Sequence, residues 1–86
     1  MSTAFQTAVR KNVQRENRYE AIDRLVEKGE RTNLSIIVQM GGLDGEFRRR
    51  ALEGLSNCRA TEELEELAED TTVAPSLRRR ADELVS

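Results

Sequence analysis

The chain has 86 residues, a formal net charge of −2, three aromatic residues, one cysteine and no histidine. This length predicts a single domain over residues 1–86, and the shortage of aromatic residues predicts a core of Leu, Ile, Val and Ala. Without histidine and with only Cys58, a structural zinc site and the commonest general base are both excluded. We therefore expect no enzyme activity, no cofactor and no catalytic or metal-binding residue.

Neither end of the chain predicts a membrane or export segment. No apolar run approaches the ~20 residues that a spanning helix needs, and the N-terminal stretch lacks the continuous apolar region of a secretory signal. A lone cysteine also fits a reducing compartment. We expect a cytoplasmic protein without a membrane partner.

The first half of the chain predicts three helices. Apolar residues at helical spacing place the first over residues 2–12 and the second over residues 17–28. No glycine or proline separates these two, so a single continuous helix remains an alternative. Gly29 is a natural end for the second helix, and Thr32 is the expected N-cap of a third that runs to about Met40.

The second half predicts three more helices and no strand. Asp44 is the expected N-cap of a helix over residues 45–56, and Thr61 of one over residues 62–70. Pro75 lies where a proline is tolerated, in the first turn of a sixth helix that reaches the end of the sequence.

A period of thirty residues runs through these elements. The stretch from Leu43 to Leu55 recurs from Val73 to Val85, and more faintly from Val13 to Leu25. The shift aligns three arginines and three alanines, which are Arg18, Arg48, Arg78, Ala21, Ala51 and Ala81. A fixed period in this range indicates stacked helical units that bury their apolar faces against one another.

The units differ in the way that such a stack requires. Ile36 and Leu52 of the middle unit correspond to Glu66 and Asp82 of the last one. A residue covered on both sides stays apolar, whereas one at an open end becomes polar. We therefore expect Ile36 and Leu52 to be covered from both sides.

The pattern D-x-x-F-R-R-R-A-L-x-x-L, a loop and then L-x-x-L-A-x-D resembles HEAT-type helical repeats over Asp44 to Val85. The short form of about 30 residues, known from phycobilisome lyases and many prokaryotic proteins, is the most similar. This resemblance implies an all-α fold, a short right-handed α-solenoid of about six antiparallel helices. It also implies framework links in which Asp44 or Asp70 pairs with Arg48 or Arg78. It does not imply lyase activity.

One candidate binding surface is acidic. The carboxylates at i, i+3, i+4 and i+7 share one helix face, and they are Glu62, Glu65, Glu66 and Glu69. In HEAT-like stacks the second helices line the concave side, so these residues would form an acidic groove that attracts a basic peptide or domain of a protein partner. The alternative is a solvated face that aids solubility.

A second candidate surface is an arginine edge. If Arg48 and Arg78 serve the framework, the remaining arginines of the two clusters are free for solvent or phosphate, and they are Arg49, Arg50, Arg79 and Arg80. Regularly spaced arginines could follow a nucleic-acid backbone. Against this, the net charge is negative and aromatic stacking partners for bases are missing.

The apolar N-terminal end is a third candidate. Met1, Phe5 and Val9 could be left incompletely covered, and then a second copy or a larger partner would complete their burial. Together these features predict a non-catalytic interaction module that binds or scaffolds proteins. A nucleic-acid-associated accessory or regulatory factor is the alternative.

Overall fold

All six predicted helices are present. The computed structural model describes residues 3–86, and within this part of the chain every regular element is helical. The helices are α1 (Thr3–Val9), α2 (Arg15–Glu27), α3 (Arg31–Gln39), α4 (Gly45–Asn57), α5 (Thr61–Glu69) and α6 (Pro75–Val85). The all-α class is confirmed, and α1 and α2 are separate helices, because residues 10–14 form a turn between them.

Two of the predicted helix starts are correct and two are wrong. Asp44 is the N-cap residue of α4, and Pro75 is the first residue of α6. The N-caps of α3 and α5 are Glu30 and Ala60, so Thr32 and Thr61 lie inside these helices. The chain turns so tightly here that the amides of Glu30 and Ala60 still bond the carbonyls of the preceding helices, both at 2.9 Å.

These two tight linkers use the same backbone conformation with different residues. Gly29 has a φ of +65°, as predicted for a glycine just past a helix end, and Arg59 has a φ of +56° at the corresponding place thirty residues later. The left-handed region is nearly free of cost for glycine but strained for arginine. Because Arg59 adopts this conformation despite the strain, the packing of the helices on both sides of the linker must impose it.

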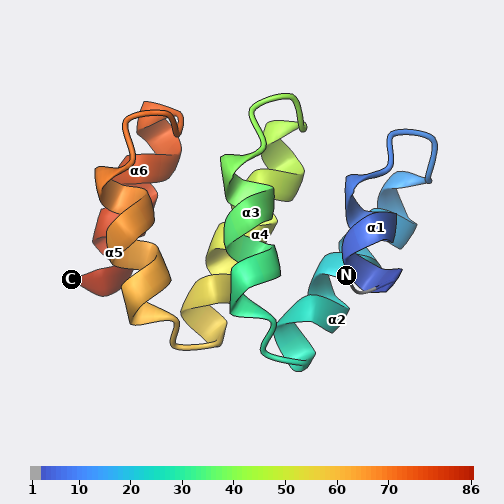
Figure 1. Cartoon of the computed structure of the whole chain (residues 1–86), viewed down its shortest axis with the longest axis horizontal. Helices are drawn as coiled ribbons and strands as arrows, with labels where there is room; N and C mark the ends of the chain where they lie inside the picture. The colour runs from blue at the N-terminus through green and yellow to red at the C-terminus, as the bar shows by residue number, and fades with distance from the viewer. Residues whose placement is uncertain (1–2) are drawn as a thin grey trace.

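The helices pack as three consecutive pairs, α1–α2, α3–α4 and α5–α6. Figure 1 shows each pair as an antiparallel hairpin, and the hairpins lie side by side along the long axis of a molecule of 33 × 24 × 19 Å. Between pairs, α4 packs on α2 and on α6, and α3 packs on α5. We call the contact of α1–α2 with α3–α4 the first seam and that of α3–α4 with α5–α6 the second seam.

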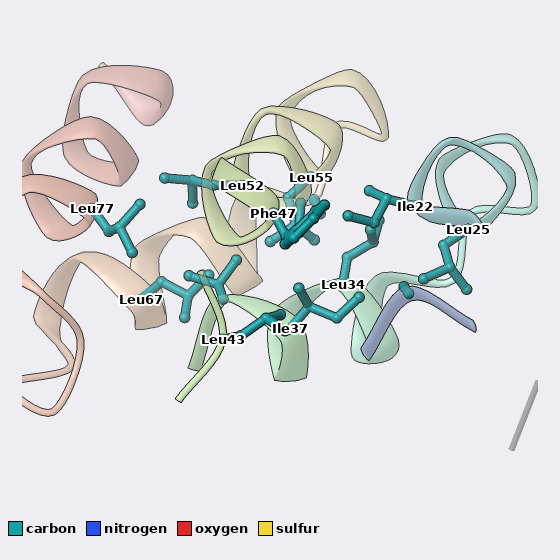
Figure 2. Packing of buried hydrophobic residues seen from close by; sticks show 14 of the residues in the cluster. Ile22, Leu25, Leu34, Ile37, Leu43, Phe47, Leu52, Leu55, Leu67 and Leu77 are labelled. Carbon is teal, nitrogen blue, oxygen red and sulfur yellow. The ribbon is translucent and has the colours of Figure 1, made fainter. Parts of the chain in front are cut away.

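One apolar core runs through both seams. Figure 2 shows Ile22 and Leu25 of α2, Phe47 and Leu55 of α4, and Leu77 of α6 in one continuous cluster. The three aligned alanines are all buried, with Ala21 at 1% exposure and the other two at 0%. Small residues at these positions let the helices approach closely.

Of the two residues predicted to be covered from both sides, one is buried and the other is exposed. Leu52 is fully buried and Asp82, its counterpart, is exposed, as predicted. The prediction for Ile36 is wrong, because this side chain is 36% exposed. Leu34, Ile37 and Val38 already occupy the core side of α3, and position 36 points about 100° away from position 37.

The N-terminal end is also better covered than expected. Phe5 is only 7% exposed, since α1 packs closely on α2, and Val9 is half-buried. Met1 lies outside the described residues. Phe5 therefore offers little apolar surface for a second copy or a partner.

Candidate functional site

The acidic face, which we define as Glu62, Glu65, Glu66 and Glu69, lies on α5. Leu64 and Leu67 turn toward the core and are almost completely buried. The helical period therefore sends the four carboxylates outward, and all four are exposed.

None of the four carboxylates forms an ion pair or a hydrogen bond with another side chain of residues 3–86. Four like charges on about two turns of one helix create a negative potential that neighbouring side chains do not cancel. Such a surface attracts a cationic partner over roughly a Debye length, about 8–10 Å at moderate salt. It is the densest block of unpaired charge in the described chain.

Two members of the arginine edge are occupied within the molecule. Arg50 donates from Nε and Nη2 to the two carboxylate oxygens of Asp23, at 3.0 and 2.8 Å. Arg80 donates in the same way to Glu53, at 2.6 and 3.0 Å. These forked pairs link α4 to α2 and α6 to α4, so Arg50 and Arg80 hold neighbouring hairpins together.

The same hydrogen bonds shift the ionisation of the paired groups. The hydrogen bond with Asp23 raises the pKa of Arg50, and the hydrogen bond with Glu53 raises that of Arg80. The hydrogen bonds from Arg80 lower the pKa of Glu53, against a smaller opposing effect of burial. Arg50, Arg80 and Glu53 are therefore charged at neutral pH.

Arg49 and Arg79 remain exposed and make no hydrogen bond or ion pair within residues 3–86. Consecutive residues of a helix point about 100° apart, so Arg49 and Arg79 project in other directions than Arg50 and Arg80. The arginine edge is consequently half as well supplied with available cations as the sequence suggested.

The predicted framework links are wrong in their partners. Arg18 and Arg48 donate from Nε to the carbonyls of Ala8 and Val38, each at 3.0 Å. These carbonyls lie in the last turns of α1 and α3, where backbone acceptors lack helical partners and the helix dipole favours a cation. A backbone acceptor thus replaces Asp44, the expected partner of Arg48.

The third framework arginine departs from this scheme. Arg78 donates from Nε to the carbonyl of Val73 at 3.1 Å. Asp70 accepts the amide and the hydroxyl of Thr72, at 2.9 and 2.6 Å. These hydrogen bonds lower the pKa of Asp70 more than the charge of Arg78 does. Asp70 therefore accepts hydrogen bonds within its own turn and does not form the expected ion pair with Arg78.

A groove of about 610 Å³ runs between α2 and α4. Tyr19, Val26, Gly54 and Asn57 supply its uncharged surface, and the pair of Asp23 and Arg50 also lines it. The helices come unusually close here, because a Cβ atom on Gly54 would stand 2.5 Å from a methyl carbon of Val26. The groove lies on the layer of even-numbered helices, whereas the acidic face belongs to the odd-numbered layer.

Two aromatic rings in contact with each other, each covered by a guanidinium group, lie in the first seam beside this groove. The guanidinium of Arg18 lies 3.9 Å from the ring centre of Phe47, whose ring lies 5.2 Å from that of Tyr19. The guanidinium of Arg50 covers the other ring at 4.7 Å. Such contacts contribute about 0.5–2 kcal/mol each, and more when water is excluded.

Sequence analysis missed the groove and the forked pairs, although a signal was present. An acid precedes an arginine by 27 residues twice, as Asp23 with Arg50 and as Glu53 with Arg80. The two occurrences are themselves thirty residues apart. A pair that recurs with the repeat period indicates a contact between neighbouring units.

Within residues 3–86, no three His, Cys, Asp or Glu side chains are grouped closely enough to hold a metal ion. No helix in this part of the chain is both long and apolar enough to cross a bilayer. A scan of family models found no match to the chain, and neither a search of curated proteins nor one of solved structures found any.

Proposed function

We propose that this chain is a short HEAT-like α-solenoid that binds another protein through the acidic face of α5. The thirty-residue period supports the repeat architecture, since helices one period apart carry equivalent contacts. The bonds from Arg18 to Ala8 and from Arg48 to Val38 are one example. A right-handed superhelix is the form that the HEAT resemblance implies for such a stack.

The observation that carries the proposed function is a contrast in the state of the surface charges. Arg50 and Arg80 are each neutralised by a carboxylate of a neighbouring helix. The four carboxylates of the acidic face have no such partner in residues 3–86, and all of them are exposed. The charge that is left for an external partner is thus concentrated on α5, and it is negative.

A partner for this surface would be basic. Complementary charge accelerates the encounter and orients the two molecules, and its contribution falls as salt rises. The exposed Ile36 of the neighbouring α3 and the half-buried Met40, its C-cap residue, add apolar area on the same layer of helices. We expect a binding surface on which complementary charge raises the association rate and apolar contact slows dissociation.

The test compares two charge reversals of equal size. Partners captured from the source organism are identified with the unchanged protein, and their affinity is then measured with Glu62→Lys plus Glu65→Lys and with Arg49→Glu plus Arg79→Glu. The first variant should lose at least about tenfold in affinity, and raised salt should weaken the unchanged protein similarly. The second variant should bind as before.

The opposite outcome would support the alternative. If the arginine variant alone loses binding, and the captured partner is a nucleic acid, the exposed Arg49 and Arg79 carry the function and the acidic face is a solvated surface. Circular dichroism and the urea midpoint of both variants provide the control for folding, because all four substituted residues are exposed.

A further inference from the structure

A small cavity lies between the loop that joins α1 to α2 and the loop that joins α3 to α4. Its volume is about 210 Å³, and it is lined by Lys11, Arg18, Gly42, Leu43 and Asp44. Two cations and one carboxylate thus surround a space large enough for a small oxyanion. The cavity is separate from the acidic face, since no residue of α5 lines it.

Arg18 carries the argument, because its charge is buried without a counterion. Only 6% of the residue is exposed, and its contacts are the carbonyl of Ala8 at 3.0 Å and the ring of Phe47. Both are neutral, and no carboxylate of residues 3–86 lies within 4 Å of the guanidinium. Burial of a charge is costly unless it is paired, so an anion at this guanidinium would be stabilised.

The neighbouring residues tune this preference. Lys11 is exposed at the mouth and adds a second positive charge without an ion-pair partner in the described chain. Arg15, close by in sequence, is already bound to Glu46 at 2.8 Å. Asp44 lines the cavity as well and makes no side-chain capping bond to α4. A bound anion therefore meets two cations and one hydrogen-bond acceptor.

We propose that this cavity binds a phosphate group. Arginine suits the oxygens of a tetrahedral anion through its fork of donors, and lysine adds a point charge. Phosphate near pH 6 still carries a proton, which it can donate to the carboxylate of Asp44. Sulfate has no proton at that pH and would meet Asp44 as a repelling acceptor, so the cavity selects phosphate over sulfate.

The repeat itself provides an internal comparison. Thirty residues later Arg48 occupies the place of Arg18, with the same bond to a carbonyl. The place of Lys11 is taken by Gly41 and that of Asp44 by Ala74. The second loop pair lacks counterparts of Lys11 and Asp44, so one phosphate per chain is expected.

The experiment is an NMR titration of the full chain at pH 6 and constant ionic strength, with inorganic phosphate, phosphoserine and sulfate in separate arms. Saturable shifts should appear in residues 10–14 and 41–45 with phosphate or phosphoserine, and sulfate should bind at least about fivefold more weakly. Whichever phosphate compound binds more tightly supports the proposal and distinguishes a free phosphate from an ester. No saturation with either would overturn it.

Two variants sharpen the outcome without disturbing the buried arginine. Lys11→Ala should weaken phosphate binding about tenfold, because one charge-assisted contact is lost. Lys28→Ala, which removes the same charge from a linker outside the cavity lining, should leave the affinity unchanged. Equal effects of the two variants would overturn the site. Asp44→Asn should bring sulfate and phosphate to similar affinities, and unchanged selectivity would overturn the role of Asp44.

Discussion

The two seams join helices in equivalent places with different chemistry. At the first seam, two neighbouring aromatic rings lie between two guanidinium groups, and Gly54 brings α4 against Val26 of α2. At the second seam, Leu77 takes the place of Phe47, and Leu84 that of Gly54. What the seams share is one forked ion pair each, Asp23 with Arg50 and Glu53 with Arg80.

This difference shows which features the shared backbone arrangement requires. Buried alanines, a forked ion pair and a left-handed linker residue occur at both seams. The rings and the close glycine contact occur only at the first. The repeated geometry therefore rests on the shared features, and the others add stability or specificity locally.

Removal of the central ring should have the largest effect. Phe47→Ala should lower the free energy of unfolding by about 4 kcal/mol, because it leaves a cavity and deprives Arg18 and Tyr19 of their contact. Leu77→Ala, the equivalent change at the second seam, should cost only about 2–3 kcal/mol. Urea denaturation measures both. An equal loss would mean that the ring stack adds nothing beyond burial.

The close helix approach should respond next. Gly54→Ala should destabilise by about 1–2 kcal/mol, since the new methyl would collide with Val26 and only part of the cost is offset by better helix propensity. Gly45→Ala, which meets open space at the start of α4, should be neutral or slightly stabilising. The double change Gly54→Ala plus Val26→Ala should recover much of the loss in thermal unfolding, and a lack of recovery would contradict the collision.

Substitutions in the two linkers that cross the seams should change the free energy of unfolding less, and in opposite directions. Arg59→Gly should stabilise the protein by about 0.5 kcal/mol, because relief of the left-handed strain exceeds the added entropy of the unfolded chain. Gly29→Ala, at the corresponding place, should destabilise by about 1 kcal/mol. Melting temperatures of the two variants should move in opposite directions, and a shift in the same direction would contradict the strain.

The forked pair at the second seam should have the smallest effect and a defined pH dependence. Arg80 lowers the pKa of Glu53, so the folded state binds this proton less readily than the unfolded state. The contribution is therefore present above the unfolded pKa, near 4.3, and is lost as pH falls through the lowered value. Glu53→Gln should cost less than about 1 kcal/mol at pH 7.

The comparison of urea midpoints at pH 7 and pH 3 tests this last prediction. The difference between Glu53→Gln and the unchanged protein should shrink at the lower pH, because protonation of Glu53 weakens its ion pair with Arg80. A difference that is independent of pH would show that the side chain acts through packing alone.

Element type was predictable from the sequence, because the helical period of Leu, Ile and Ala is strong in every unit. The exact helix starts were less so. Thr32 and Thr61 have the chemistry of N-caps, but the fully buried Ala60 and the bond from Glu30 to Leu25 place the helix starts earlier. Tertiary packing of the linkers overrode the local preference.

The surface residues, too, were predictable from the sequence only in part. The exposure of the acidic face followed from the position of Leu64 and Leu67 alone. The occupation of Arg50 and Arg80 did not, since their partners lie 27 residues away on another helix. Ile36 shows the limit of comparing units: its apolar character suggested burial, yet its rotation around α3 leaves it facing outward.

The middle hairpin is the one element on which both ends of the molecule depend. α2 packs on α3 and α4, and α5 and α6 pack on the same two helices from the other side. Either outer hairpin can thus fray without first disturbing the opposite one. Amide hydrogens of α3 and α4 should be the last to exchange with deuterium, and a partner that loosens one end would leave the other end folded.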